Sequence, residues 1–288
     1  MAIVVDAHHH FWDTSDLTYD YYWMTDELAA IRGRFGPDDM RPLLAARGID
    51  LTVLIQTIPS LPETEQFLAT AAATDFVAGV VGWVDLTDPG VASTLARLKA
   101  RPDGRKLVGI RHQAHDEPDP DWLRRPDVLH GIAAVQQAGL AYDVLVRARE
   151  LPAALDLVWG LPEGRFVINH IAKPNIKEHE LEPWASLIKP LADCSNVWVK
   201  VSGMIEEADW AHWRPEDLVP YVQRLLDWFG PERLIFGSNW PVCLLAGSYV
   251  QVYDALVQAL GDITPDEHDR IFGGNAATAY RLDVGMPL

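Results

Sequence analysis

Eight short runs of apolar and β-branched residues recur along this chain, and stretches with helical spacing of their apolar residues separate them. The runs lie at residues 3–7, 51–56, 76–84, 107–111, 141–146, 165–169, 196–201 and 233–237. The helical stretches lie at residues 63–74, 89–99, 127–138, 152–159, 183–193 and 216–229. Each run is typical of a strand buried on both faces, so the alternation predicts a parallel sheet covered by helices.

Eight parallel strands can form an open doubly wound sheet or a closed barrel. No Gly-x-Gly-x-x-Gly follows the first run, and polar residues end nearly every run instead of gathering at one switch point. The sequence therefore predicts the α/β class and a (β/α)₈ TIM barrel, with one domain over residues 1–288. Residues 246–282 are expected to add terminal helices, one of them capped at Thr264.

The charge balance narrows the range of partners. The chain has 24 Lys and Arg against 41 Asp and Glu, a formal charge of -17, which repels phosphate backbones and anionic lipid. No nucleic acid and no membrane are expected, and no apolar run is long enough for a leader or a membrane span. Cys194 and Cys243 form neither a disulfide framework nor a thiolate metal site. We expect a cytoplasmic monomer or homodimer that acts on a small molecule.

Histidines stand at the ends of the first and sixth runs. Because strand side chains alternate, His8 and His10 project to one side and can converge on one metal ion or one substrate. His170, where the sixth strand meets its loop, would complete a set of three imidazoles. The alternative is that the first cluster is a packed aromatic corner with Phe11 and Trp12.

Charged residues mark three other runs. Arg111 ends the fourth run and offers a fixed fork of donors for a carboxylate or for the oxygens of a polyol lactone, unless it forms a buried ion pair. Asp143 and Arg147 share a face of the fifth strand and either pair with each other or contact ligand, structural pairing being favoured for Arg147. Lys200, in the apolar seventh run, needs a partner or a lowered pKa.

These motifs in order resemble one protein family. The motifs are DAHHH at 6–10, GIRH at 109–112, HIAKP at 170–174 and FGSNWP at 236–241, with further matches at 115–118, 151–155 and 274–277. The set is similar to the amidohydrolase 2 group of the amidohydrolase superfamily, which includes L-fuconolactonase and L-rhamnonolactonase. The resemblance implies an amidohydrolase-like barrel, and a lactonase, a hydrolase of carboxylic ester bonds that opens a small sugar-acid lactone in carbohydrate catabolism.

Asn239 departs from the family pattern, which implies an Asp at this position as base or metal ligand. A neutral amide can orient water or substrate but cannot accept a proton near neutral pH. Three interpretations are open: another group, His170 or His112, is the base; the chain is a mutant made to trap a complex; or the chain no longer catalyses. We favour the first.

The working hypothesis is attack of water on the lactone carbonyl. Arg111, with imidazoles from His8, His10 or His112, would stabilise the charge that develops on oxygen, and His170 would hold or deprotonate the water. No metal or other cofactor is expected to be required. The alternative is one divalent cation, zinc by preference, bound by His8, His10 and His170.

Aromatic residues near the strand ends suit a sugar ring. Trp12, Trp23 and Trp240 offer flat apolar faces, although core packing explains Trp12 and Trp240 equally well. The remaining expected substrate-binding residues are His112, Asp143 and Lys200. Loop carboxylates after the fourth and seventh runs, Glu117, Glu206 and Glu207, could accept hydrogen bonds from substrate hydroxyls, although most loop carboxylates are merely solvated. The competing functions are a lactone isomerase or a decarboxylase on the same barrel, and a variant that binds lactone or sugar acid without catalysis.

Overall fold

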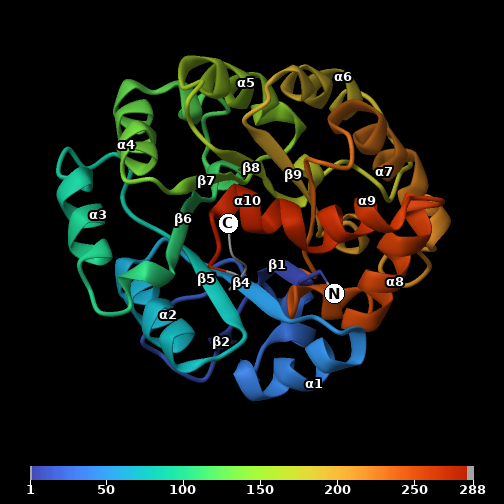
Figure 1. Ribbon diagram of the computed structural model, residues 1–288, viewed down its shortest axis with the longest axis horizontal. Coiled ribbons are helices and arrows are strands. Elements are labelled where there is room, and N and C mark those ends of the chain that lie inside the picture. The colour runs from blue at the N-terminus through green and yellow to red at the C-terminus, as the bar shows by residue number, and fades with distance from the viewer. Residues whose placement is uncertain (1, 284–288) are drawn as a thin grey trace.

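The computed structural model describes residues 2–283 as an eight-stranded parallel barrel with helices around it. The barrel strands are β1 (Val5–His9), β4 (Leu51–Ile55), β5 (Val77–Gly82), β6 (Leu107–His112), β7 (Ala141–Val144), β8 (Phe166–Ile168), β9 (Val197–Val201) and β10 (Leu234–Phe236). They lie side by side in chain order, so all eight predicted strands are confirmed (Figure 1). Residues 1 and 284–288 of the predicted single domain lie outside the described residues.

The barrel closes between β1 and the segment that follows β10. Asn239 N donates to His8 O at 2.7 Å, and His10 N donates to Trp240 O at 2.7 Å. The buried Asp6 reinforces this seam, because it accepts from Ser238 N at 2.9 Å and from Tyr249 OH at 3.1 Å. Closure therefore brings the carboxyl end of the first strand directly beside that of the last.

Helices cover the outside of the barrel and one of its ends. They are α1 (Pro37–Arg47), α2 (Leu61–Ala73), α3 (Val91–Lys99), α4 (Pro126–Gln137), α5 (Leu151–Gly160), α6 (Trp184–Ile188), α7 (Pro215–Phe229), α8 (Tyr249–Leu260), α9 (Pro265–Asp269) and α10 (Asn275–Tyr280). The predicted cap of α9 is confirmed, because Glu267 N donates to Thr264 Oγ1 at 3.3 Å. The sequence analysis did not predict α1, nor the small pair β2 (Trp12–Asp13) and β3 (Arg34–Phe35).

The terminal helix α10 lies across the barrel in Figure 1, at the amino ends of the strands. Its Ala276 and Tyr280 pack with inward-facing barrel residues such as Val5, Val53 and Val167. A second, larger core lies between the strands and the surrounding helices. Because α10 fills one end of the barrel, the polar strand ends can form a site only at the other, carboxyl end.

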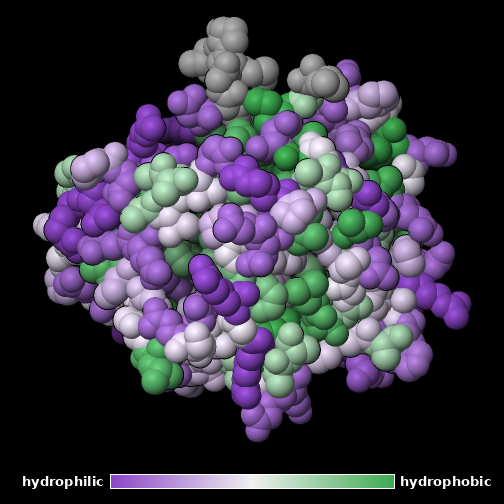
Figure 2. Space-filling view, turned by 90° about the horizontal axis from the view of Figure 1, so that it is seen from below, coloured by the Kyte–Doolittle hydropathy of each residue, from purple (hydrophilic) through white to green (hydrophobic). Residues whose placement is uncertain are grey.

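One face of the molecule is mostly hydrophilic. Hydrophilic side chains cover most of the side seen in Figure 2, with apolar residues in small groups between them. Among the described residues, no helix combines the length and the apolar character needed to cross a membrane.

The packing of α4 gives a first prediction. A Cβ at Gly131 would lie 2.1 Å from the carbonyl oxygen of Leu86, so Gly131→Ala is expected to lower the free energy of unfolding by about 2 kcal/mol or more. At Gly160, the last residue of α5, a Cβ meets nothing within 4 Å, so Gly160→Ala should instead stabilise by about 0.5–1 kcal/mol. Urea denaturation of both variants tests this, and a stable Gly131→Ala would contradict the close packing described here.

Candidate active site

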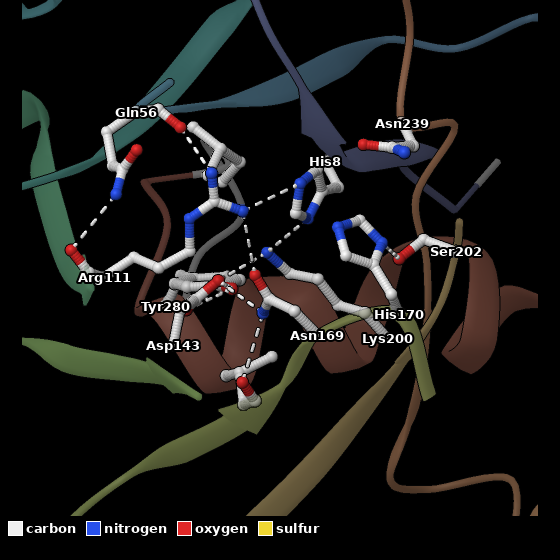
Figure 3. A network of polar contacts seen from close by, with 12 residues as sticks. His8, Gln56, Arg111, Asp143, Asn169, His170, Lys200, Ser202, Asn239 and Tyr280 are labelled. Carbon is white, nitrogen blue, oxygen red and sulfur yellow. Dashed lines mark hydrogen bonds and ion pairs between the residues drawn. The ribbon is translucent and has the colours of Figure 1, made fainter. Parts of the chain in front are cut away.

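Three imidazoles meet at the carboxyl ends of β1 and β8. The ring centroid of His8 lies 5.0 Å from that of His10, as the strand alternation predicts, and 4.3 Å from that of His170. Figure 3 shows His8 and His170 side by side. His9 points the other way and hydrogen-bonds Thr52 Oγ1 at 2.9 Å. Burial, reinforced by nearby positive charge, holds the pKa values of His8, His10 and His170 well below the usual range. The three rings are therefore neutral at pH 7.

A left-handed turn positions His170. Residues 170–173 all have positive φ, between 48° and 59°, and none of them is glycine. Such a conformation is strained for L-residues, by roughly 1–2 kcal/mol per residue. Lys173 N donates to His170 O at 2.8 Å, and Trp184 Nε1 donates to Ile171 O at 2.6 Å, which holds the turn in place. Because the turn has about three residues per revolution, His170 and Lys173 share a face, and both reach the same cavity.

Because Gly203 has no side chain, it leaves space for the ring of His170 beside the end of β9. A Cβ at this position would lie 2.4 Å from His170 Nδ1, and the φ of Gly203 is +62°. The neighbouring Ser202 Oγ lies 3.0 Å from the same Nδ1 and fixes the orientation of the ring.

Asp143 is the centre of a buried polar network below the imidazoles (Figure 3). It accepts from Lys200 Nζ at 2.7 Å, from Asn169 Nδ2 at 2.9 Å, and from Tyr280 OH at 2.7 and 2.9 Å. Burial lowers the pKa of Lys200 to about 8, an effect that Asp143 opposes. Lys200 therefore has the partner that the sequence required, and it remains charged at pH 7.

Arg111 connects this network to the imidazoles. Its Nη1 lies 3.3 Å from Asn169 Oδ1 and 3.3 Å from His8 Nε2, and its Nη2 donates to the carbonyl oxygen of Gln56. Burial lowers its pKa to about 10, so the guanidinium stays charged at neutral pH. Its Nε is buried and has no hydrogen-bond partner within the described part of the chain.

The imidazole set does not fit a metal ion. His8 Nε2 faces Arg111 Nη1 at 3.3 Å, and His8 Nδ1 faces Lys200 Nζ at 3.4 Å, so a fixed cation stands at each ring nitrogen. A divalent ion on His8 would lie beside both positive charges. Over residues 2–283, no group of three or more His, Cys, Asp or Glu side chains has an arrangement that could hold a metal.

A cavity of about 420 Å³ opens above this network. The predicted site residues that line it are His10, Arg111, His170, Asn239 and Trp23. The other lining residues are Leu28, Thr57, Gln113, His115, Asp116, Leu145, Arg147, Lys173, Glu206, Glu207, Trp210, Val242 and Leu245. The cavity thus joins residues from the carboxyl ends of seven of the eight barrel strands, all except β5, and from the loops that follow them.

Three predicted residues lie beneath the cavity and not in its lining. His8, Asp143 and Lys200 are fully buried. They therefore act by positioning the residues that line the cavity and by placing charge beneath them. The favoured pairing of Arg147 with Asp143 is wrong, because Lys200 occupies that carboxylate and Arg147 lines the cavity.

His112, Trp12 and Trp240 also lie outside the lining, and direct contact with substrate does not follow from their positions. Trp83 Nε1 donates to His112 Nδ1 at 3.1 Å, and His112 Nε2 lies 2.8 Å from Glu117 Oε1, so both ring nitrogens are engaged. Trp12 and Trp240 are buried against other aromatic rings, which agrees with the core-packing alternative.

Glu206, which the sequence analysis did not separate from other loop carboxylates, lines the cavity. It lies in a 3₁₀ turn after β9, and its Oε1 accepts from Asn239 Nδ2 at 2.7 Å. Burial raises its pKa to about 7, although the bond from Asn239 lowers it. Asn239 has φ of +55°, a conformation that asparagine tolerates, and this turns its amide toward both Glu206 and His10. Nothing in the sequence separates Glu206 from other loop carboxylates.

Comparisons with known proteins agree on one family. The amidohydrolase family model matches residues 5–282. The chain is 40% identical over 287 residues to an L-fucono-1,5-lactonase of Burkholderia ambifaria, which covers 98% of this chain and 97% of that one. It is 35% identical over 298 residues to an L-fucono-1,5-lactonase of Burkholderia multivorans, with the same coverage.

Solved structures show the same fold. A crystal structure of an amidohydrolase from Burkholderia multivorans with bound HEPES has a TM-score of 0.90 at 33% identity, and covers 98% of this chain and 100% of that one. A second crystal structure of an amidohydrolase from that organism, with bound zinc, has a TM-score of 0.89 at 34% identity and the same coverage.

The network around Asp143 yields a stability prediction. Tyr280→Phe removes a hydrogen bond to a buried carboxylate and is expected to lower the free energy of unfolding by about 1.5–3 kcal/mol. Tyr221 is the matched control, because its OH donates to a neutral carbonyl, Glu180 O, at 3.0 Å, and Tyr221→Phe should cost only about 0.5–1.5 kcal/mol. Denaturation at pH 7 measures both, and a smaller loss in Tyr280→Phe than in Tyr221→Phe would contradict a charged Asp143.

Proposed function

The chain belongs to the amidohydrolase family, and from this premise we propose that it hydrolyses a small sugar-acid lactone, such as L-fuconolactone, to the open acid. Full-length similarity to two L-fucono-1,5-lactonases supports the reaction class. The observation that carries the proposal is that one cavity contains both a carboxyl group with a pKa near 7, Glu206, and a buried guanidinium, Arg111. Enzymatic hydrolysis of an ester is accelerated by a base for the attacking water and by a hydrogen-bond donor or positive group for the developing oxyanion.

In the proposed reaction, ionised Glu206 takes a proton from a water molecule while the water oxygen attacks the lactone carbonyl carbon. The charge that develops on the carbonyl oxygen is stabilised by Arg111, whose guanidinium is fixed before substrate arrives. When the tetrahedral intermediate collapses, the bond from carbon to ring oxygen breaks. Protonated Glu206 returns its proton to that oxygen, which becomes a hydroxyl, and the new acid ionises.

This mechanism revises the expected base. His112 has both ring nitrogens engaged, and the lowered pKa of His170 makes it a weak base, better suited to hold the water. Asn239 orients Glu206: its amide can donate to the ionised carboxylate and, after half a turn, accept from the protonated one. An Asp at position 239 could not donate to an ionised Glu206.

The competing functions have weaker support. Glu206 supplies the carboxylate that position 239 lacks, which removes the main reason to expect a variant that only binds. An isomerase or a decarboxylase would give a migrated ring or release carbon dioxide, so product analysis by NMR separates these reactions from ring opening. We also propose that the enzyme works in the cytoplasm as a monomer or homodimer on a small lactone.

Glu206→Gln is expected to lower kcat/KM by about 10²–10⁴-fold, because the base is lost. In the parent enzyme, kcat/KM should rise with pH through about 7, as Glu206 ionises, and this limb should vanish in Glu206→Gln. Acid release from a lactone panel, followed with a pH indicator, measures both effects.

The matched control is Glu63→Gln. Burial also raises the pKa of Glu63 to about 7, but Glu63 does not line the cavity: its carboxyl accepts from the backbone N–H groups of Ile58 and of Thr57, which is itself a lining residue. The rise of kcat/KM with pH near 7 should remain in that variant. Full activity and an unchanged pH profile in Glu206→Gln would rule out Glu206 as the base.

We propose further that no metal ion is required, since the positive charges of Arg111 and Lys200 beside His8 would repel a bound metal ion. Zinc in a relative of known structure makes this worth testing directly. After dialysis against a chelator, the enzyme should keep its activity with substoichiometric zinc by elemental analysis. Loss of activity that only added zinc restores would establish the alternative set of His8, His10 and His170.

A further inference from the structure

Three residues of the cavity lining carry a buried polar atom that has no hydrogen-bond partner within residues 2–283. The atoms are Trp23 Nε1, Arg111 Nε and His115 Nδ1. Over the same residues, four other buried side-chain nitrogen or oxygen atoms lack a partner, and none of the four belongs to this lining. A buried polar group without a partner is costly, and native proteins contain few of them. Their concentration around one cavity indicates that its ligand supplies the missing partners.

Trp23 offers a donor to this cavity. It lies in the irregular segment between β2 and the 3₁₀ turn Asp26–Ile31, and its ring packs edge to face against Trp12 at a centroid distance of 5.6 Å. The two indoles differ in their bonds, because Trp12 Nε1 donates to Ile31 O at 3.0 Å. An indole N–H can only donate, so Trp23 requires an acceptor from outside the described chain.

His115 offers an acceptor. It lies in the 3₁₀ turn Ala114–Asp116 after β6, and burial lowers the pKa of its ring to about 3, so the ring is neutral and carries one proton. Its Nε2 lies 3.5 Å from Asp116 Oδ1, and the carboxylate favours the proton on this nitrogen. Nδ1 is then left with a lone pair and requires a group that donates.

The loops that carry Trp23 and His115 meet at the cavity. Tyr22, which precedes Trp23, directs its hydroxyl at the carboxyl of Asp116, which follows His115. The proposed base, Glu206, comes from a different loop, the one after β9. A lactone whose carbonyl carbon lies beside Glu206 can therefore extend its hydroxyl groups toward these two loops.

We infer that Trp23 and His115 bind hydroxyl groups of the substrate: Trp23 Nε1 donates to one hydroxyl oxygen, and His115 Nδ1 accepts from another hydroxyl. This inference rests on the proposed lactonase function and assigns residues that recognise the polyol part of the lactone. A hydroxyl both donates and accepts, whereas an ether or carbonyl oxygen would leave His115 Nδ1 without a partner. Trp23 then acts through its N–H, and not only through the flat face that the sequence suggested.

The kinetic test compares L-fucono-1,5-lactone with δ-valerolactone, a 1,5-lactone that has no hydroxyl groups. Trp23→Phe keeps an aromatic ring and removes the N–H, and His115→Phe removes the acceptor. Each variant should lower kcat/KM for L-fucono-1,5-lactone about 5–150-fold, because a substrate hydroxyl is left without its partner. The kcat/KM for δ-valerolactone should stay at the parent value, since that lactone has no hydroxyl that could lose a bond.

Urea denaturation separates this role from a structural one. The matched control is Trp213→Phe, because Trp213 lies outside the lining and its Nε1 donates to Ala246 O at 2.8 Å. That variant should lower the urea midpoint of unfolding and leave the hydrolysis of both lactones unchanged. Trp23→Phe should leave the midpoint of the ligand-free protein unchanged or raise it, because no bond within the protein is lost.

A lower urea midpoint in Trp23→Phe together with an unchanged kcat/KM would place the partner of Nε1 inside the protein and overturn the inference. Equal losses of activity toward both lactones would overturn it too, because contacts to hydroxyl groups cannot affect δ-valerolactone.

Calorimetry with L-fuconate, the open acid, separates the inference from the proposed function, and it also decides the case in which δ-valerolactone is too poor a substrate. If the parent opens no lactone, yet Trp23→Phe and His115→Phe bind L-fuconate more weakly than Trp213→Phe does, the hydroxyl contacts stand while the lactonase function fails. Turnover of L-fucono-1,5-lactone with no loss in either variant has the reverse meaning. A parent that shows neither turnover nor binding overturns both.

Discussion

The buried ion pair of Lys200 and Asp143 is the interaction on which the rest of the site depends. Both side chains are fully buried at the centre of the barrel, where an isolated charge would be very unfavourable. Asp143 is stable there because Lys200, Tyr280 and Asn169 all donate to it. Removal of one partner from such a pair typically costs about 3–5 kcal/mol. This pair in turn fixes the side chains that contact Arg111 and His8.

Positive charge around His8 affects the protonation state of the imidazoles. Burial, reinforced by Lys200 and Arg111 at its ring nitrogens, lowers the pKa of His8 and keeps the ring neutral. In the proposed reaction the base is Glu206, whose Oε1 accepts from the neutral amide of Asn239 in the cavity lining. With an Asp at position 239, two carboxyl groups would lie within hydrogen-bond distance of each other, and each would disfavour ionisation of the other. Asn239 avoids this repulsion.

Local strain serves the same arrangement. Four successive residues in the left-handed conformation, including the β-branched Ile171, are maintained only because their surroundings hold them. Bonds from Trp184 and the ion pair of Lys173 with Glu207 supply that support. The result is that His170 and Lys173 reach one cavity from one turn.

The sequence by itself determined the barrel and part of the site. Periodic apolar runs fix eight buried strands, and alternation along β1 places His8 and His10 on one side, because strand geometry depends only on the local chain. Arg111, His170 and Asn239 could be placed at strand ends for the same reason. Tertiary structure alone decided that Glu206 reaches Asn239, that Tyr280 crosses from the terminal helix to Asp143, and that His112 turns away from the cavity. These contacts join segments far apart in sequence through irregular loops, whose paths no periodicity encodes.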